Sequence, residues 1–200
     1  LWNIASSNII NLVLLITAVC WYRQYRDLWN KHFIDELLFA GIAVAFPLAL
    51  MHFSMDQSPY VIPILLFFYL LYRLSDRVFN RSHTEPDAEG EKSGNAKLGL
   101  LYIIGSIVTI SVAGNFLGTS AEAIVNKMEI PIILVGWLLG FITSLPELTI
   151  FFRVYSEAKK KGTVGGTDDT QEVLDNLAGS NMSNVGIIYP IALLAFLLAT

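Results

Sequence analysis

Charged residues and cysteines are scarce in this chain, and each shortage narrows what the protein can be. Charged residues make up 15% of the 200 positions and apolar residues 54%, with a mean hydropathy of +0.55. A soluble domain typically carries about 25% charged residues. Cys20 is the only cysteine, which excludes an intramolecular disulfide and a cysteine-based metal site. This composition predicts an integral membrane protein.

Six hydrophobic spans can be drawn along the chain, each near the about 20 residues that cross a bilayer core. They run over Leu1–Trp21, Glu36–Phe53, Tyr60–Leu74, Leu98–Gly118, Ile130–Phe152 and Leu174–Thr200. A polar, acidic stretch at 76–97 separates the third span from the fourth and is typical of a solvated linker. The predicted fold is therefore an all-α, polytopic membrane helical bundle in two parts, 1–75 and 98–200.

The basic residues predict the orientation of this bundle. Twelve of the thirteen Lys and Arg lie in the first, third and fifth loops, and Lys127 alone lies on the other side. The twelve are Arg23, Arg26, Lys31, Arg73, Arg77, Arg81, Lys92, Lys97, Arg153, Lys159, Lys160 and Lys161. Loops rich in Lys and Arg stay in the cytoplasm. We therefore expect a multi-pass protein of the cell membrane, plasma or inner, with its odd-numbered loops and the linker 76–97 in the cytoplasm.

Two polar segments that lie far apart in the chain read almost alike. Residues 3–11 (NIASSNIIN) open the first span, and residues 176–184 (NLAGSNMSN) open the last. Asn and Ser side chains in lipid are costly unless they bind something. On the predicted topology the two spans run in opposite directions, so the repeat is inverted. An inverted repeat that carries polar groups into the bilayer is typical of a transporter built from two related halves.

The fifth span carries the strongest candidate for chemistry. Glu147 is the only acidic residue deep inside a predicted span, where a charge costs at least ~2.5–3.5 kcal/mol. Pro146 lacks an N–H group and clashes with the carbonyl of Ile142, so a helix break is expected there. Thr143 and Ser144 precede Glu147 by four and three residues, which places them on one helix face. A carboxylate with hydroxyls and freed carbonyls suits Ca²⁺ or Na⁺ rather than soft metals.

The last span brings a second set of polar side chains to the same depth. Glu147 and Ser180 each lie ~10 Å from the inner end of their spans, at ~1.5 Å per residue. Ser180 and Asn184 share a helix face, and so do Ser7 and Asn11. We therefore expect the hairpin of the fifth and sixth spans to present its polar residues to one cavity. The Ser7 and Asn11 pair would approach that cavity from the outer half.

These motifs resemble a known family. Residues 143–148 (TSLPEL), followed by Gly179-Ser180-Asn181-x-x-Asn184, resemble the second alpha-repeat of the calcium/cation antiporter superfamily, which includes the sodium/calcium exchangers. Residues 3–11 resemble the end of the first alpha-repeat. The resemblance implies a ten-helix parent of two inverted halves, of which this chain covers helices three to eight. The parent's other helices, including the first carboxylate motif, would then be needed for activity.

The resemblance also implies roles for individual residues. It implies that Glu147 is one of two central carboxylates that bind Ca²⁺ and, in exchange, Na⁺ or protons. The remaining oxygens, from hydroxyl, backbone or amide groups, would come from Thr143, Ser144, Ser7, Ser180, Asn11 and Asn184.

Three positions depart from the family pattern, and two polar residues are expected to act structurally. Ile142 and Ser6 stand where the family commonly has Gly, and Asn184 stands where some members have Asp. These departures leave the counter-ion open. Asn8 and Asn181 are expected to cap or cross-brace helices rather than to bind ions.

The expected function is secondary antiport rather than an enzymatic reaction. The protein would export Ca²⁺ in exchange for Na⁺ or H⁺ by alternating access. Its partners would be the lipid bilayer and small inorganic cations as cargo, with no cofactor and no nucleic acid. The alternatives left open are an ion channel, a non-transporting scaffold, and an exchanger that is K⁺-coupled or moves Mn²⁺ or Mg²⁺. An organic-anion carrier would need basic residues embedded deep in the membrane, and no predicted span carries one there.

Overall fold

The computed structural model describes residues 1–26, 28, 30, 33–79, 131–162 and 167–199, with single positions between 99 and 127. Every regular element that these residues form is a helix, which confirms the predicted all-α fold. The helices are α1 (Trp2–Tyr22), α2 (Ile34–His52), α3 (Val61–Phe79), α5 (Ile132–Thr143), α6 (Leu145–Lys161), α7 (Thr167–Ser183), the π-helix Asn184–Ile188 and α8 (Tyr189–Ala199). Most of the predicted linker and of the fourth span lies outside the described residues.

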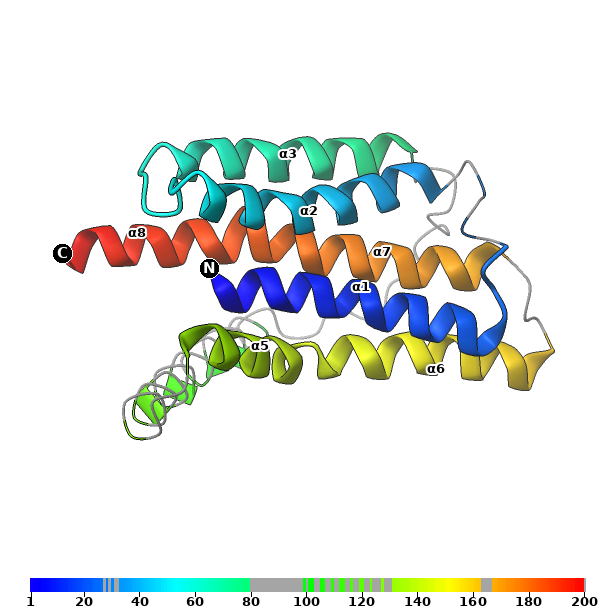
Figure 1. Cartoon of the computed structure of the whole chain (residues 1–200). Helices are drawn as coiled ribbons and strands as arrows, with labels where there is room; N and C mark the ends of the chain where they lie inside the picture. The colour runs from blue at the N-terminus through cyan, green and yellow to red at the C-terminus, as the bar shows by residue number, and fades with distance from the viewer. Residues whose placement is uncertain are drawn as a thin grey trace. The chain divides into compact units, whose positions relative to one another are not determined.

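The chain divides into two units, and the candidate site belongs to the first. This unit comprises Leu1–Ser75 and Gly136–Thr200, and the second comprises Asp76–Val135. Within the first unit, α1 and α6 run in one direction while α2 and α7 run in the other (Figure 1). Two helices from the two halves of the sequence, α1 and α7, are therefore antiparallel, as an inverted repeat requires.

Four stretches of helix in the described part are long and apolar enough to cross a membrane. They are Trp2–Tyr22, Ile34–His52, Ile133–Lys161 and Thr167–Leu198. The last two each combine consecutive helices, so the fifth and sixth predicted spans appear as interrupted helices. The predicted third span, except Tyr60, falls within α3, which is not in this set because its last turns carry three charged residues: Arg73, Asp76 and Arg77.

The helices α6 and α7 extend further toward their shared loop than the predicted spans do. Helix α6 continues past Phe152 to Lys161, and α7 begins at Thr167 rather than at Leu174. Three lysines in the last turn of α6 and two aspartates in the first turn of α7 complement the helix dipoles. Gly162 ends α6 in the left-handed conformation, with φ of 72°. Hydropathy alone misses these turns because their residues are largely charged or polar.

Helix α1 packs on α5 with almost no space between the backbones. A Cβ atom on Gly136 would lie 2.7 Å from Cβ of Trp2, and one on Gly140 would lie 2.8 Å from the backbone nitrogen of Ser7. The Ser6 hydroxyl donates to the Gly136 carbonyl at 2.8 Å. Glycines four residues apart are the usual device for close helix contact in membranes. Ser6, which departs from the family pattern, thus joins the two helices.

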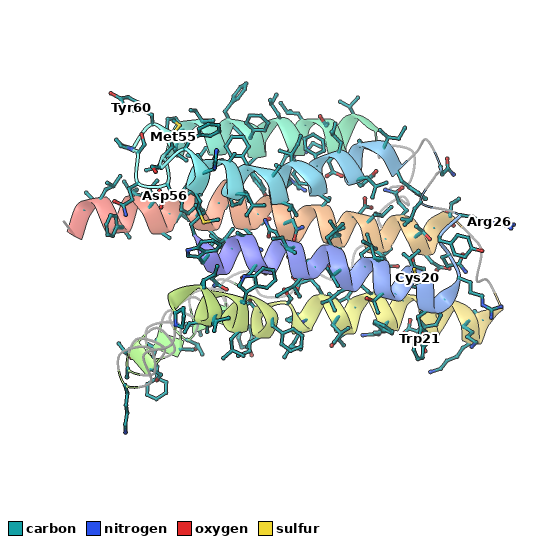
Figure 2. All side chains as sticks on the ribbon, in the orientation of Figure 1. Cys20, Trp21, Arg26, Met55, Asp56 and Tyr60 are labelled. Carbon is teal, nitrogen blue, oxygen red and sulfur yellow. The ribbon has the colours of Figure 1, made fainter. Side chains whose placement is uncertain are left out.

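Apolar packing surrounds the polar centre of the unit. One buried cluster joins α1, α6 and α7 through Leu15, Val19, Phe151, Tyr155 and Leu174. The two ends of the unit carry exposed aromatic side chains, with Tyr60 76% exposed at one end and Trp21 74% exposed at the other. Figure 2 shows Tyr60, Met55 and Asp56 at one end and Cys20 and Trp21 at the opposite end. Aromatic residues at both ends are typical of the two membrane interfaces.

Candidate cation site

A break between α5 and α6 organises the site. Helix α5 ends at Thr143 and α6 begins at Leu145, so Ser144 alone separates them. Pro146 stands in the first turn of α6, where its missing N–H group leaves no hydrogen bond unmade. The predicted break is therefore present. Glu147 also lies in this first turn, where the positive end of the helix dipole favours a carboxylate.

Glu147 meets Ser180 across the α6–α7 interface. The Ser180 hydroxyl donates to Oε1 of Glu147 at 2.6 Å. The second carboxylate oxygen, Oε2, is buried and has no hydrogen-bond partner. A buried carboxylate oxygen without a partner costs free energy that a bound cation or proton would recover. The two residues that the sequence places at one depth are thus in direct contact.

Helix α1 contributes a serine at the helix break. The hydroxyl oxygens of Ser7 and Ser144 share a hydrogen bond at 3.2 Å, and the Ser144 hydroxyl also lies 3.3 Å from the Ser7 carbonyl. Ser144 is fully buried and Ser7 is 5% exposed. Because α1 and α6 run in the same direction, Asn11 lies one turn beyond this contact on α1, as Glu147 does on α6. The break therefore sits between oxygen-bearing side chains of three helices.

Four asparagines connect α1 to α7 and to the π-helix in a symmetric pattern. Asn11 donates to Oδ1 of Asn181 at 2.9 Å, and Asn184 donates to Oδ1 of Asn8 at 2.9 Å. The amide of Asn8 reaches the Asn181 carbonyl at 3.3 Å, and the amide of Asn181 reaches the Asn8 carbonyl at 3.2 Å. In the sequence repeat Asn8 matches Asn181 and Asn11 matches Asn184. Each bond therefore has its counterpart under the inverted repeat, and the predicted cross-bracing by Asn8 and Asn181 is confirmed.

The bracing fixes one more oxygen near the centre. Asn11 is completely buried, and its Oδ1 has no hydrogen-bond partner while its amide nitrogen is held by Asn181. The Asn8 amide also donates to the carbonyl of Ala43 in α2 at 2.8 Å. The hydrogen bonds among Asn8, Asn11, Asn181 and Asn184, called the asparagine lattice below, thus hold the Asn11 side chain in one orientation. Its oxygen remains available to a ligand.

Thr143 does not join this group through its hydroxyl. Its side chain is exposed, and the hydroxyl donates within its own helix, to the carbonyls of Leu139 at 3.0 Å and Gly140 at 3.1 Å. Of the seven predicted ligands, the direct contacts join Ser7 to Ser144 and Ser180 to Glu147. Asn11 and Asn184 enter through the asparagine lattice.

Two polar residues that the sequence did not single out have buried polar atoms inside the bundle. Glu36 is 3% exposed and accepts a hydrogen bond from Gln171 at 2.6 Å. It was overlooked because it begins a predicted span, where acidic residues usually face the interface. Asn176 carries a buried Oδ1 with no hydrogen-bond partner. Its place at the start of the repeated segment was a signal that the analysis did not use.

The described residues supply a single carboxylate at this centre. No three His, Cys, Asp or Glu side chains among them come close enough to hold a metal ion. The oxygens that gather around the break are otherwise neutral hydroxyl and amide groups.

Comparison with known proteins identifies the family. The family model for the sodium/calcium exchanger protein matches residues 98–198, which is half of the chain. The chain belongs to the sodium/calcium exchanger family. The matched segment of this exchanger contains Glu147, Ser144, Ser180 and Asn184, whereas Ser7 and Asn11 lie outside it. No curated protein and no solved structure shows a significant match to the chain. The exchanger is thus a multi-pass membrane protein of a family of cation transporters.

Proposed function

We propose that this exchanger moves Ca²⁺ out of the cell in exchange for Na⁺ or H⁺, and that Glu147 binds the cation. One observation carries the proposal. Glu147 sits at a helix break with one carboxylate oxygen held by Ser180 and the other buried without a partner. A cation or a proton at Oε2 would satisfy this atom. Cargo and counter-ion would then compete for the same carboxylate, and this competition couples their movements.

The donor set favours a hard cation. The side chains that meet at the break offer carboxylate, hydroxyl and amide oxygens, and neither sulfur nor imidazole is among them: Glu147, Ser144, Ser7, Ser180 and Asn11. Oxygen-only sites are typical of Ca²⁺ and Na⁺. Ca²⁺ requires about six to eight oxygen ligands. The carbonyl of Ile142, which Pro146 leaves without an amide donor, would supply one more.

The site needs a second carboxylate to balance a divalent charge. Among the described residues, the hydrogen bonds at this centre involve one carboxylate, that of Glu147. We propose that a segment outside this chain supplies the second one, in keeping with the resemblance of residues 3–11 to the end of a first repeat. Such a segment would also cover the exposed faces of α1 and α5.

The reciprocal asparagine bonds support alternating access. They relate α1 to α7 by the symmetry of the repeat, and they rigidly join the helices that carry Ser7 and Ser180. Transporters with inverted repeats expose a fixed central site to each face in turn by moving one part against the other. On the positive-inside rule, the end of the bundle that bears the α6–α7 loop faces the cytoplasm.

The test is gradient-driven uptake of ⁴⁵Ca by the protein in liposomes, with Na⁺ or a proton gradient as the driving force. We expect uptake with one of the two gradients and its loss in Glu147→Gln. Asp168→Asn is the matched control, because this substitution also removes one negative charge and Asp168 is exposed in the first turn of α7. Equal uptake by Glu147→Gln and the control would refute the assignment.

A further inference from the structure

Two asparagines outside the predicted site occupy equivalent positions in the inverted repeat. Asn3 opens one repeated segment and Asn176 opens the other, and each precedes its serine, Ser7 or Ser180, by four residues. Four residues make one helical turn of about 6 Å. Because α1 and α7 are antiparallel, the two asparagines lie one turn from the centre toward opposite ends of the unit.

Asn176 lines a polar hollow between α6 and α7, on the side of the α6–α7 loop. The hollow has a volume of about 480 Å³, and Ile150, Arg153, Glu157, Asp169 and Glu172 also line it. Ile150 follows Glu147 by three residues and Asn176 precedes Ser180 by four. The hollow, called the inner hollow below, therefore ends within one helical turn of the Glu147–Ser180 pair.

Asn3 lines a different hollow at the opposite end of the same unit. Its volume is about 390 Å³, and its polar lining residues include Asp56, Gln57 and Tyr189. The Tyr189 hydroxyl donates a hydrogen bond to the Asp56 carbonyl, which links α8 to the α2–α3 loop at the edge of this hollow. Figure 2 shows Asp56 at the end where α2 meets α3. Asn3 and Asn176, which match in the repeat, thus each line a hollow at opposite ends of the unit; the hollow at Asn3 is called the outer hollow below.

The side chain of Asn176 has no evident structural use for its oxygen. Its Oδ1 is buried and accepts no hydrogen bond. Leaving such an atom unpaired costs about 1–3 kcal/mol. Asn8 and Asn181, by contrast, use their amides in the lattice that braces the helices. An amide oxygen is a common ligand for Ca²⁺ and for Na⁺.

We propose that Asn176 and Asn3 are the access ligands of the exchanger, each serving the hollow on its own face. The inference rests on the proposed function, in which Glu147 holds the cation. On entry from the inner hollow, the Asn176 oxygen replaces one water of a partly hydrated cation before Ser180 and Glu147 take it. Asn3 does the same between the outer hollow and Ser7. Neither residue is part of the central site, so each acts on one face only.

The test measures the Ca²⁺ concentration for half-maximal exchange separately at the two faces, in liposomes of defined orientation. We expect Asn176→Leu to raise it about fivefold at the inner face, equivalent to about 1 kcal/mol, and to leave the outer face unchanged. We expect Asn3→Leu to do the reverse, so each variant is the control for the other. Asn176→Asp retains an oxygen and should keep the inner value near that of the wild type. Asn176→Ser provides the same sided comparison if Asn176→Leu does not insert into membranes.

The outcomes separate this inference from the proposed function. If Asn176 variants change both faces equally, or neither face, the access role is overturned while loss of exchange in Glu147→Gln still stands. If the full-length wild-type protein, which includes the segment outside this chain, neither binds nor exchanges Ca²⁺, the proposed function itself fails. A sided effect that appears in both Asn176→Leu and Asn176→Asp would assign it to packing rather than to the oxygen.

Discussion

Gly140→Ala is the perturbation whose consequence the structure specifies most closely. The added Cβ would overlap the Ser6 hydroxyl, which must turn away, and would lie 2.8 Å from the backbone nitrogen of Ser7, whereas ordinary contacts begin near 3.4 Å. Helix α1 must therefore retreat by about 0.6 Å, the difference between these distances. The same shift along the Ser7–Ser144 direction would stretch their hydrogen bond from 3.2 Å to about 3.8 Å, beyond bonding range.

The energies of this substitution can be estimated term by term. Overpacking costs about 1–3 kcal/mol, and the lost hydrogen bond costs about 1 kcal/mol. The better helix propensity of Ala returns up to about 1 kcal/mol. We therefore expect a net loss of stability of about 1–3 kcal/mol together with weaker cation binding.

The assay for Gly140→Ala is thermal unfolding in detergent, followed by ⁴⁵Ca uptake in liposomes. Gly41→Ala is the matched control, because a Cβ on Gly41 in α2 meets no atom within 4 Å. The control should be as stable as the wild type or slightly more stable, with normal uptake. A Gly140→Ala protein with wild-type stability and uptake would refute the account of how α1 is held against the break.

Two further predictions concern the hydroxyl at the carboxylate and the orientation of the bundle. Ser180→Ala removes the hydrogen bond that Glu147 accepts from the Ser180 hydroxyl, so Ca²⁺ affinity should fall less than in Glu147→Gln, by about threefold to tenfold in an equilibrium titration. An unchanged affinity would contradict the role of Ser180. In a Cys20→Ser background, a membrane-impermeant maleimide added to intact cells should label Tyr60→Cys but not Arg26→Cys, which lie at opposite ends of the unit (Figure 2). The reverse labelling would overturn the predicted topology.

The centre of the site could be predicted from the sequence because it depends on local properties of the chain, namely the position of a proline and the rise of a helix per residue. Pro146 determines where the helix can break whatever its surroundings, and the depths of Glu147 and Ser180 follow from helix rise alone. The cross-bracing by Asn8 and Asn181 was predictable because buried amides in a bilayer require partners. The identity of those partners required the packing of α1 against α7.

The remaining features depend on packing that no local pattern determines. Thr143 shares the i to i+4 spacing with Glu147, yet its side chain is exposed and its hydroxyl bonds to the carbonyls of its own helix. The close approach of Gly140 to Ser7 depends on two helices more than a hundred residues apart in sequence. The burial of Glu36 likewise depends on Gln171, from the other half of the chain.

The most direct test of the central claim is an equilibrium Ca²⁺ titration of the purified protein. The account predicts that wild type and Asp168→Asn bind Ca²⁺ with the same affinity, and that Glu147→Gln binds it more than tenfold more weakly, equivalent to at least about 1.4 kcal/mol. Added Na⁺ or protons should weaken Ca²⁺ binding in the wild type, since they compete for the same carboxylate. Glu147→Gln protein that binds Ca²⁺ as tightly as the wild type would contradict the claim that this carboxylate holds the transported cation.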